Sequence, residues 1–121
     1  MVVAVLVAVL LRGGEPSAAD RLESLQEDVR PALAALELVP IHYESPNATT
    51  HAAAADQLEV ARETVDKLVD ELRARDPGET RALLADLDRL GELVRTTGRA
   101  DEVEEATRET AARLRRLVGL D

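Results

Sequence analysis

The sequence predicts an all-α protein, an up-down-up-down four-helix bundle, and three observations lead to this fold class. Aromatic residues make up only 1% of the chain while 45% of it is hydrophobic, so the core must be aliphatic. Apolar residues recur at spacings of three and four in four successive segments, which is the periodicity of an amphipathic helix. Short turn and capping signals separate the last three segments, and short connections make successive helices antiparallel.

The length and charge of the chain narrow the classes of function. A chain of 121 residues forms one domain around a single core. Its net charge of -9 disfavours nucleic acid and anionic lipid surfaces as partners, because both require cations from the protein. The absence of cysteine excludes disulfides, thiolate metal sites and cysteine nucleophiles. We therefore expect no nucleic-acid partner, and membrane contact only through the N-terminus.

Residues 1–16 differ from the rest of the chain and are expected to form an apolar N-terminal segment and linker before a bundle of residues 17–121. Residues 2–11 are apolar without interruption and are followed by Arg12 and two glycines. This run is shorter than the roughly 20 residues that span a bilayer, but it matches the apolar part of a signal peptide or anchor. We expect an extracytoplasmic protein, exported or membrane-anchored. The alternative is that the run forms a buried strand or helical turn of the domain.

The first predicted helix covers residues 18–39. Ser17 and Asp20 form a capping-box pattern at its start. Pro31 lies inside it, and an internal proline removes a hydrogen bond and clashes with the preceding turn. The apolar stripe crosses the proline without a change of phase, so the sequence predicts one bent helix rather than two. The stripe consists of Leu22, Leu25, Val29, Leu33 and Leu36.

The second predicted helix begins near Asn47 or Thr50 and ends at Arg75. Its apolar residues alternate strictly at spacings of three and four, which favours packing at a shallow angle in a bundle. The same register places His51 on the apolar face, toward the end of the core, and Glu63 on the solvent face. The apolar residues are Leu58, Ala61, Val65, Leu68 and Leu72.

The third predicted helix has clear start and stop signals. Asp76 is its expected N-cap, with Pro77 at the first helical position and Glu79 completing the capping box. Gly98 is the expected stop. Gly91 lies inside this helix at a cost in helix propensity, and we expect the close approach of a neighbouring helix to offset that cost. The apolar stripe is Leu83, Leu87, Leu90 and Val94.

The fourth predicted helix begins around Asp101, with Glu104 three residues later, and ends at Gly119. Acidic residues gather at its start and arginines at its end, which complements the helix macrodipole. Its stripe is Val103, Ala106, Thr110, Leu114 and Leu117.

Residues 38–51, between the first two helices, form the candidate functional site. This stretch holds both histidines, the only tyrosine and two of the five prolines. We expect it to be the one irregular connection long enough to present side chains to a ligand. His42, Glu44 and His51 form a candidate metal site, with Tyr43 or Asp56 within reach, and such ligands suit Fe, Cu or Zn. The alternative is that both histidines are ordinary surface or packing residues.

The catalytic and cofactor motifs common in helical bundles are missing from the sequence. Neither histidine has a glutamate three residues before it, as a di-iron carboxylate centre requires. The chain also has no Cys-x-x-Cys-His haem motif, Gly-rich phosphate loop, His-Glu-x-x-His helix or serine-centred triad motif. We therefore expect a non-enzymatic domain that folds without a required cofactor.

A family resemblance adds to this interpretation. An apolar helix end leads into Ile41-His42-Tyr43, and a short polar loop, an alanine-rich helix, a proline-initiated helix and a Glu- and Val-rich helix follow. This order resembles the extracytoplasmic helical domain that precedes the membrane part of some bacterial and archaeal high-affinity iron permeases, over about residues 32–117. The resemblance implies an accessory iron-handling or sensing domain, with a membrane transport component as partner. The chain departs from that family in lacking the permease part and in having His42 where an acidic residue is more usual.

Two functions from different classes follow from the sequence. One is an exported metal-associated domain that uses His42, Glu44 and His51. The other is a structural or protein-interaction bundle without a ligand, whose exposed helical seam meets a partner or a second copy of the chain. Metal titration distinguishes these two functions.

Overall fold

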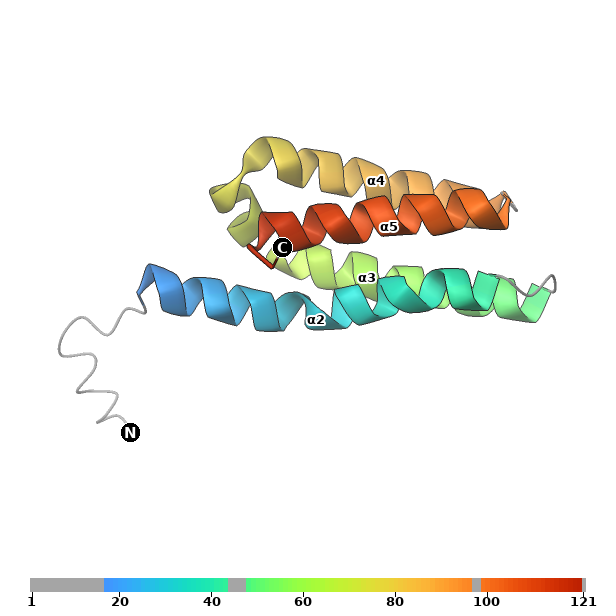
Figure 1. Ribbon diagram of the computed structural model, residues 1–121, viewed down its shortest axis with the longest axis horizontal. Coiled ribbons are helices and arrows are strands. Elements are labelled where there is room, and N and C mark those ends of the chain that lie inside the picture. The colour runs from blue at the N-terminus through green and yellow to red at the C-terminus, as the bar shows by residue number, and fades with distance from the viewer. Residues whose placement is uncertain (1–16, 44–47, 97–98, 121) are drawn as a thin grey trace.

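The computed structural model describes residues 17–43, 48–96 and 99–120, and the regular structure in these ranges is entirely helical. Its elements are α2 (Ala18–Tyr43), α3 (Ala48–Arg75), α4 (Pro77–Arg95) and α5 (Ala100–Leu117). Figure 1 shows successive helices running in opposite directions, with the start of α2 and the end of α5 at the same end of the molecule.

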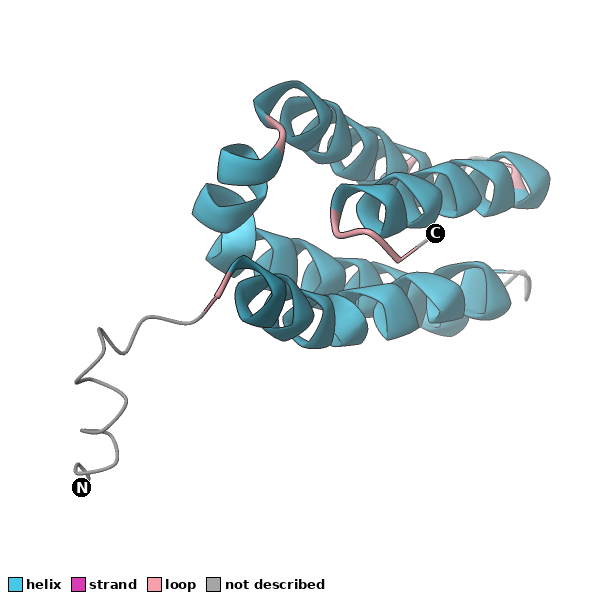
Figure 2. Ribbon diagram, turned by 60° about the vertical axis from the view of Figure 1, so that its left-hand side comes forward, coloured by secondary structure: helices cyan, strands magenta, loops and turns pink. Residues whose placement is uncertain are grey.

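The four helices close into a ring of neighbours. Each helix packs against the next one in the chain, and α2 also packs against α5. Figure 2, which looks more nearly along the helices, shows α2 and α3 below the α4 and α5 pair. The expected up-down-up-down four-helix bundle is therefore confirmed.

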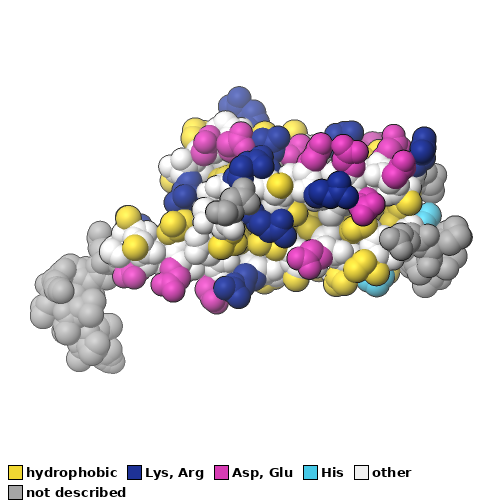
Figure 3. Space-filling model, in the orientation of Figure 1, with side chains coloured by type: hydrophobic (Ala, Val, Ile, Leu, Met, Phe, Trp, Pro, Cys, Tyr) yellow, Lys and Arg dark blue, Asp and Glu magenta, His cyan; other side chains and the backbone are white. Residues whose placement is uncertain are grey.

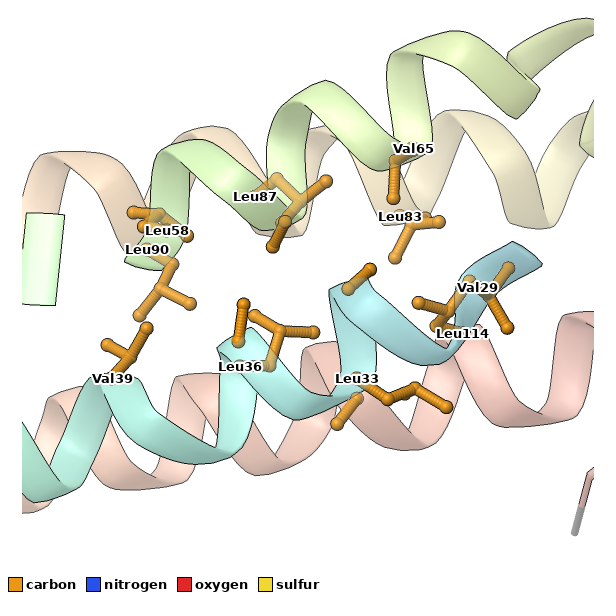
Figure 4. Close-up of a cluster of buried hydrophobic side chains, with 14 of the residues drawn as sticks. Val29, Leu33, Leu36, Val39, Leu58, Val65, Leu83, Leu87, Leu90 and Leu114 are labelled. Atoms are coloured by element: carbon orange, nitrogen blue, oxygen red, sulfur yellow. The ribbon is translucent and has the colours of Figure 1, made fainter. Parts of the chain in front are cut away.

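The core is aliphatic apart from Tyr43, as the composition required. Figure 4 shows α2 side chains, among them Leu36 and Val39, directed toward side chains of α3 and α4 such as Leu58 and Leu90. The predicted stripe of α3 is buried throughout, which confirms its register, and Glu63 is exposed. The largest fully buried side chains are Leu36, Leu72, Leu83, Leu90, Leu114, Val29, Val39, Val65, Val103 and Val118.

Helix α2 crosses Pro31 as one continuous helix, as predicted, but it continues four residues beyond the predicted end at residue 39. It passes through Pro40 and ends at Tyr43, so the expectation of an irregular connection over residues 38–51 is wrong. Leu36, Val39 and Tyr43 extend the buried stripe across the proline. An internal proline costs about 3 kcal/mol, and burying Val39 and Tyr43 stabilises the helix by an amount of similar size.

The predicted caps are present at the starts of α2 and α4. The hydroxyl of Ser17 accepts a hydrogen bond from the Asp20 amide at 3.1 Å, and the carboxylate of Asp76 accepts one from the Glu79 amide at 3.0 Å. The reciprocal half of the second capping box is not formed, because the Asp76 amide donates to the carbonyl of Leu72. Helix α5 begins at Ala100, one residue earlier than expected.

The carboxylate of Glu79 binds a neighbouring helix instead. Arg113 of α5 donates to Glu79 at 3.0 Å and to Asp86 at 2.7 Å, both on α4. The hydrogen bond to Asp86 is the main cause of the raised pKa of Arg113. This half-buried triad links α4 to α5 by charge-assisted hydrogen bonds.

Side chains from two other helices cap the C-terminal end of α5. Arg75 donates from its Nε to the carbonyl of Leu117 at 2.7 Å, and Gln26 donates to the carbonyl of Val118 at 2.7 Å. The last carbonyls of a helix have no partner within the helix, so these bonds satisfy them and join α2 and α3 to the end of α5. Gly119 follows with a positive φ of 74°, the backbone conformation that commonly ends a helix.

The buried polar side chains of the bundle are all satisfied locally. Thr80, Thr107 and Thr110 are buried, and each hydroxyl donates to the backbone carbonyl four residues earlier in the chain. In the part of the chain that the structure describes, no buried side-chain nitrogen or oxygen lacks a hydrogen-bond partner. Among the described residues, the core therefore offers no unpaired polar side chain.

None of the described helices is both long enough and apolar enough to cross a membrane. The apolar segment of residues 1–16, on which the expectation of export rests, lies outside the described residues.

Candidate functional site

The structure places the two histidines on neighbouring helix ends. His42 lies in the last turn of α2 and His51 in the first turns of α3, and both are partly buried. Figure 3 shows histidine side chains at this end of the bundle, beside the grey residues. Glu44, the third predicted ligand, lies outside the described residues. His42 is therefore held by a helix rather than by the proline-bracketed loop that the sequence suggested.

The ring that His51 contacts is that of Tyr43. The two rings are stacked, with their centroids 4.2 Å apart and their planes 9° from parallel. Tyr43 is only 4% exposed, and this burial raises the pKa of its phenol above the ordinary value of 10.0. Stacking covers one face of the imidazole and orients the ring of His51.

The described residues do not form a complete metal site. No group of three or more His, Cys, Asp or Glu side chains with suitable geometry occurs among them. Asp56, the further acid considered with the site, is exposed on α3. The metal hypothesis thus depends on Glu44, and it stays a prediction.

An open groove lies between α3 and α4 in the part of the chain that the structure describes. Its volume is about 900 Å³, at the upper end of the range typical of ligand sites. His51 lines one end of it, and Asp66 and Leu87 lie toward the middle of the bundle. The apolar lining residues are Ala52, Ala55, Leu58, Leu87, Gly91 and Val94. We call this feature the α3/α4 groove.

The edges of the α3/α4 groove are acidic. They carry five carboxylates against the guanidinium groups of Arg62 and Arg95, which gives a net charge of -3 with His51 neutral. The carboxylates are those of Glu59, Glu63, Asp66, Asp88 and Glu92.

Arg62 ties the two walls of the groove together. It donates to Asp66 on its own helix at 3.3 Å and forms an ion pair with Asp88 on α4. The hydrogen bond to Asp88 is the main cause of the raised pKa of Arg62. Because these groups are substantially exposed, the pair positions the walls more than it stabilises the fold.

Gly91 corrects an expectation from the sequence. A Cβ atom built on Gly91 would lie 3.6 Å from the Cδ2 atom of Leu58, which is an ordinary van der Waals contact. Helix α3 is thus not so close that only glycine fits, and the predicted reason for this glycine is wrong. Gly91 lines the α3/α4 groove, and the absence of a side chain there leaves the groove open.

Sequence reasoning missed this groove. The available signal was a set of small residues, Ala52 and Ala55 near the start of one helix and Gly91 near the end of the next. Antiparallel neighbours bring such positions together, so their coincidence could have indicated a gap in side-chain packing.

A second hollow, of about 230 Å³, lies between α2 and α5. In Figure 3 hydrophobic side chains are visible along the seam between these helices, with charged side chains on both sides. Pro40 of α2 and Ala111 of α5 line it, and Arg115 pairs with Glu37 across the seam at 3.9 Å. Its small volume makes it a weaker candidate than the α3/α4 groove.

Comparisons with protein families, with characterised proteins and with solved structures give no match to this chain. The resemblance to the domain of iron permeases therefore stays a prediction.

Proposed function

We propose that this chain is a non-enzymatic binding module that holds a helical segment of a partner protein in the α3/α4 groove. The observation that carries the proposal is the open groove of about 900 Å³, with an apolar lining and acidic edges. Grooves between helices commonly bind an amphipathic helix, which buries its apolar face against the apolar lining of the groove.

The spacing of the lining residues favours a helix as the ligand. Ala52, Ala55, Leu58 and Arg62 follow one another at intervals of three and four, so they form a straight strip along α3. Gly91 and Val94 do the same on α4. A third helix can place one ridge of side chains between two such strips. The strip from residue 51 to residue 66 matches a partner helix of about 16 residues, at a rise of about 1.5 Å per residue.

The chemistry of the lining also favours binding over catalysis. The lining residues that the structure describes include no serine, threonine, cysteine or lysine. Carboxylates and one imidazole are present, but they are spread along the edges of an open surface, where water has free access. Electrostatic catalysis depends on a site that excludes water.

A selection from displayed amphipathic helices tests this proposal, with the full chain as the target. The expected result is a set of helices that bind the chain and lose binding to the Ala55→Leu variant. Ala55 is exposed in the groove, so the added side chain would fill the groove without disturbing the core. Ala74→Leu is the matched control, because Ala74 is exposed on the same helix outside the groove. Failure to select binders, or equal binding to both variants, would contradict the proposal.

A second candidate function is metal handling outside the membrane, with a membrane transport component as partner. The observation that favours it is the placement of His42 and His51 on adjoining helix ends, with His51 oriented by Tyr43. Glu44 would supply a third ligand, and the N-terminal segment would export or anchor the chain. Thermal melting with and without Zn, Cu or Fe tests this candidate.

A further inference from the structure

We propose that the helix held in the α3/α4 groove is basic along one edge only. Its lysines or arginines, spaced four residues apart, would face Glu59 and Glu63. This inference rests on the proposed binding function and adds the chemistry and orientation of the partner.

Glu59 and Glu63 differ from the other acids of the groove because neither forms an ion pair with any residue that the structure describes. Asp66 and Asp88 are both bound by Arg62, and Glu92 is paired with Arg95. Lys67 lies four residues beyond Glu63, but no ion pair joins them. The α3 edge of the groove thus offers two carboxylates that are available to a ligand, while the acids of the α4 edge are occupied.

The two available carboxylates also repel one another. They lie four residues apart on one helix, so they are neighbours on its surface, and like charges at this spacing destabilise a helix. A cation placed between or beside them removes this repulsion and adds attraction. A partner that brings positive charge to this edge therefore gains affinity that a neutral partner does not.

The α4 edge attracts cations less than the α3 edge, because its carboxylates Asp88 and Glu92 are paired with Arg62 and Arg95. Arg95 lines the groove there and is positively charged, and its partner Glu92 is already neutralised. A basic residue of the partner on this edge would lie near the guanidinium of Arg95 and would find no unpaired carboxylate among the described lining residues. The partner helix that fits has an apolar face, a basic edge toward α3 and a neutral or acidic edge toward α4. Because reversing this helix in the groove would exchange its two edges, the pattern also fixes the direction in which it runs.

The size of the effect follows from exposed ion pairs. One such pair contributes up to about fivefold in affinity, and about threefold is a middle value, so loss of both contacts should weaken binding by about tenfold. Because both carboxylates are exposed, added salt should reduce the difference.

The test uses the same selection, in which the library varies the edge positions among lysine, glutamine and glutamate. Selected helices should be enriched in lysine on one edge, with a spacing of four. Their dissociation constants should rise about tenfold for the double variant Glu59→Gln/Glu63→Gln. The matched control is Glu105→Gln/Glu109→Gln on α5, which makes the same charge change at the same spacing, away from the groove and without loss of an ion pair.

The outcomes separate this inference from the proposed function. Helices that depend on Ala55 but show neither lysine enrichment nor dependence on Glu59 and Glu63 would overturn the inference and leave groove binding intact. Equal weakening by the two double variants would also overturn it, because the effect would then reflect net charge alone. Selected helices that ignore Ala55→Leu would remove both proposals.

Discussion

Replacing Gly91 with alanine should stabilise the protein. Glycine inside a helix is less favourable than alanine by about 0.5–1 kcal/mol, because the backbone at a glycine loses more conformational entropy on folding. The new methyl group would meet the Cδ2 atom of Leu58 at 3.6 Å, so it gains contact without overlap. The full difference in helix propensity should therefore appear as stability.

We expect Gly91→Ala to raise the free energy of unfolding by about 0.5–1 kcal/mol. In a domain of this size the melting temperature should rise by about 2–4 °C. Chemical denaturation and thermal melting followed by circular dichroism measure both quantities. The matched control is Ala85→Gly, at an exposed position of the same helix, which should lower stability by a similar amount.

Destabilisation by Gly91→Ala would refute this reasoning. It would mean that α3 and α4 approach so closely at Leu58 that only glycine fits there. The groove would then be narrower than the structure has it, and its proposed function would lose support.

Three further predictions concern the core, the tyrosine and the histidines. Leu68→Ala should lower the free energy of unfolding by about 2–5 kcal/mol, measured with denaturant, because Leu68 is buried. Glu63→Ala should be nearly neutral because Glu63 is exposed. Equal losses in the two variants would contradict the register of α3. Burial raises the pKa of Tyr43, so the folded state favours the neutral phenol, and stability should be fully present below pH 10.0 and fall as the pH rises through the raised pKa. Ultraviolet absorbance of the phenolate, in native chain and in denaturant, measures this shift, and coincident titrations would contradict it. If the metal hypothesis holds, Zn, Cu or Fe at a hundredfold excess over its dissociation constant should stabilise the wild type by about 2.7 kcal/mol. The double variant His42→Ala/His51→Ala should not be stabilised. An unchanged melting temperature of the wild type would contradict the hypothesis.

The sequence was sufficient for the fold because each helix carries its own signals. The stripe of α3 from Leu58 to Leu72 defines a buried face within one segment. Asp76 and Pro77 mark the start of α4, because Asp76 caps an amide only three residues further along the chain, that of Glu79. Such local patterns need no knowledge of the other helices.

The end of α2 and the candidate groove could not be predicted in the same way. Helix α2 passes Pro40 because Tyr43 is buried by the rest of the bundle, which is a tertiary effect that outweighs a local one. The groove depends on the distance between Leu58 and Gly91 and on the pairing of Arg62 with Asp88, residues far apart in the chain. The position of His51 toward the end of the core was predicted from its register, but its stacking on Tyr43 was not.

The most direct test of the binding proposal is to map a selected helix onto the chain by the changes it causes in backbone amide chemical shifts. We predict that the changes concentrate in α3 between residues 51 and 66 and in α4 between residues 87 and 95, which border the α3/α4 groove. Changes concentrated on α2 and α5, with the α3/α4 groove unaffected, would contradict the proposal.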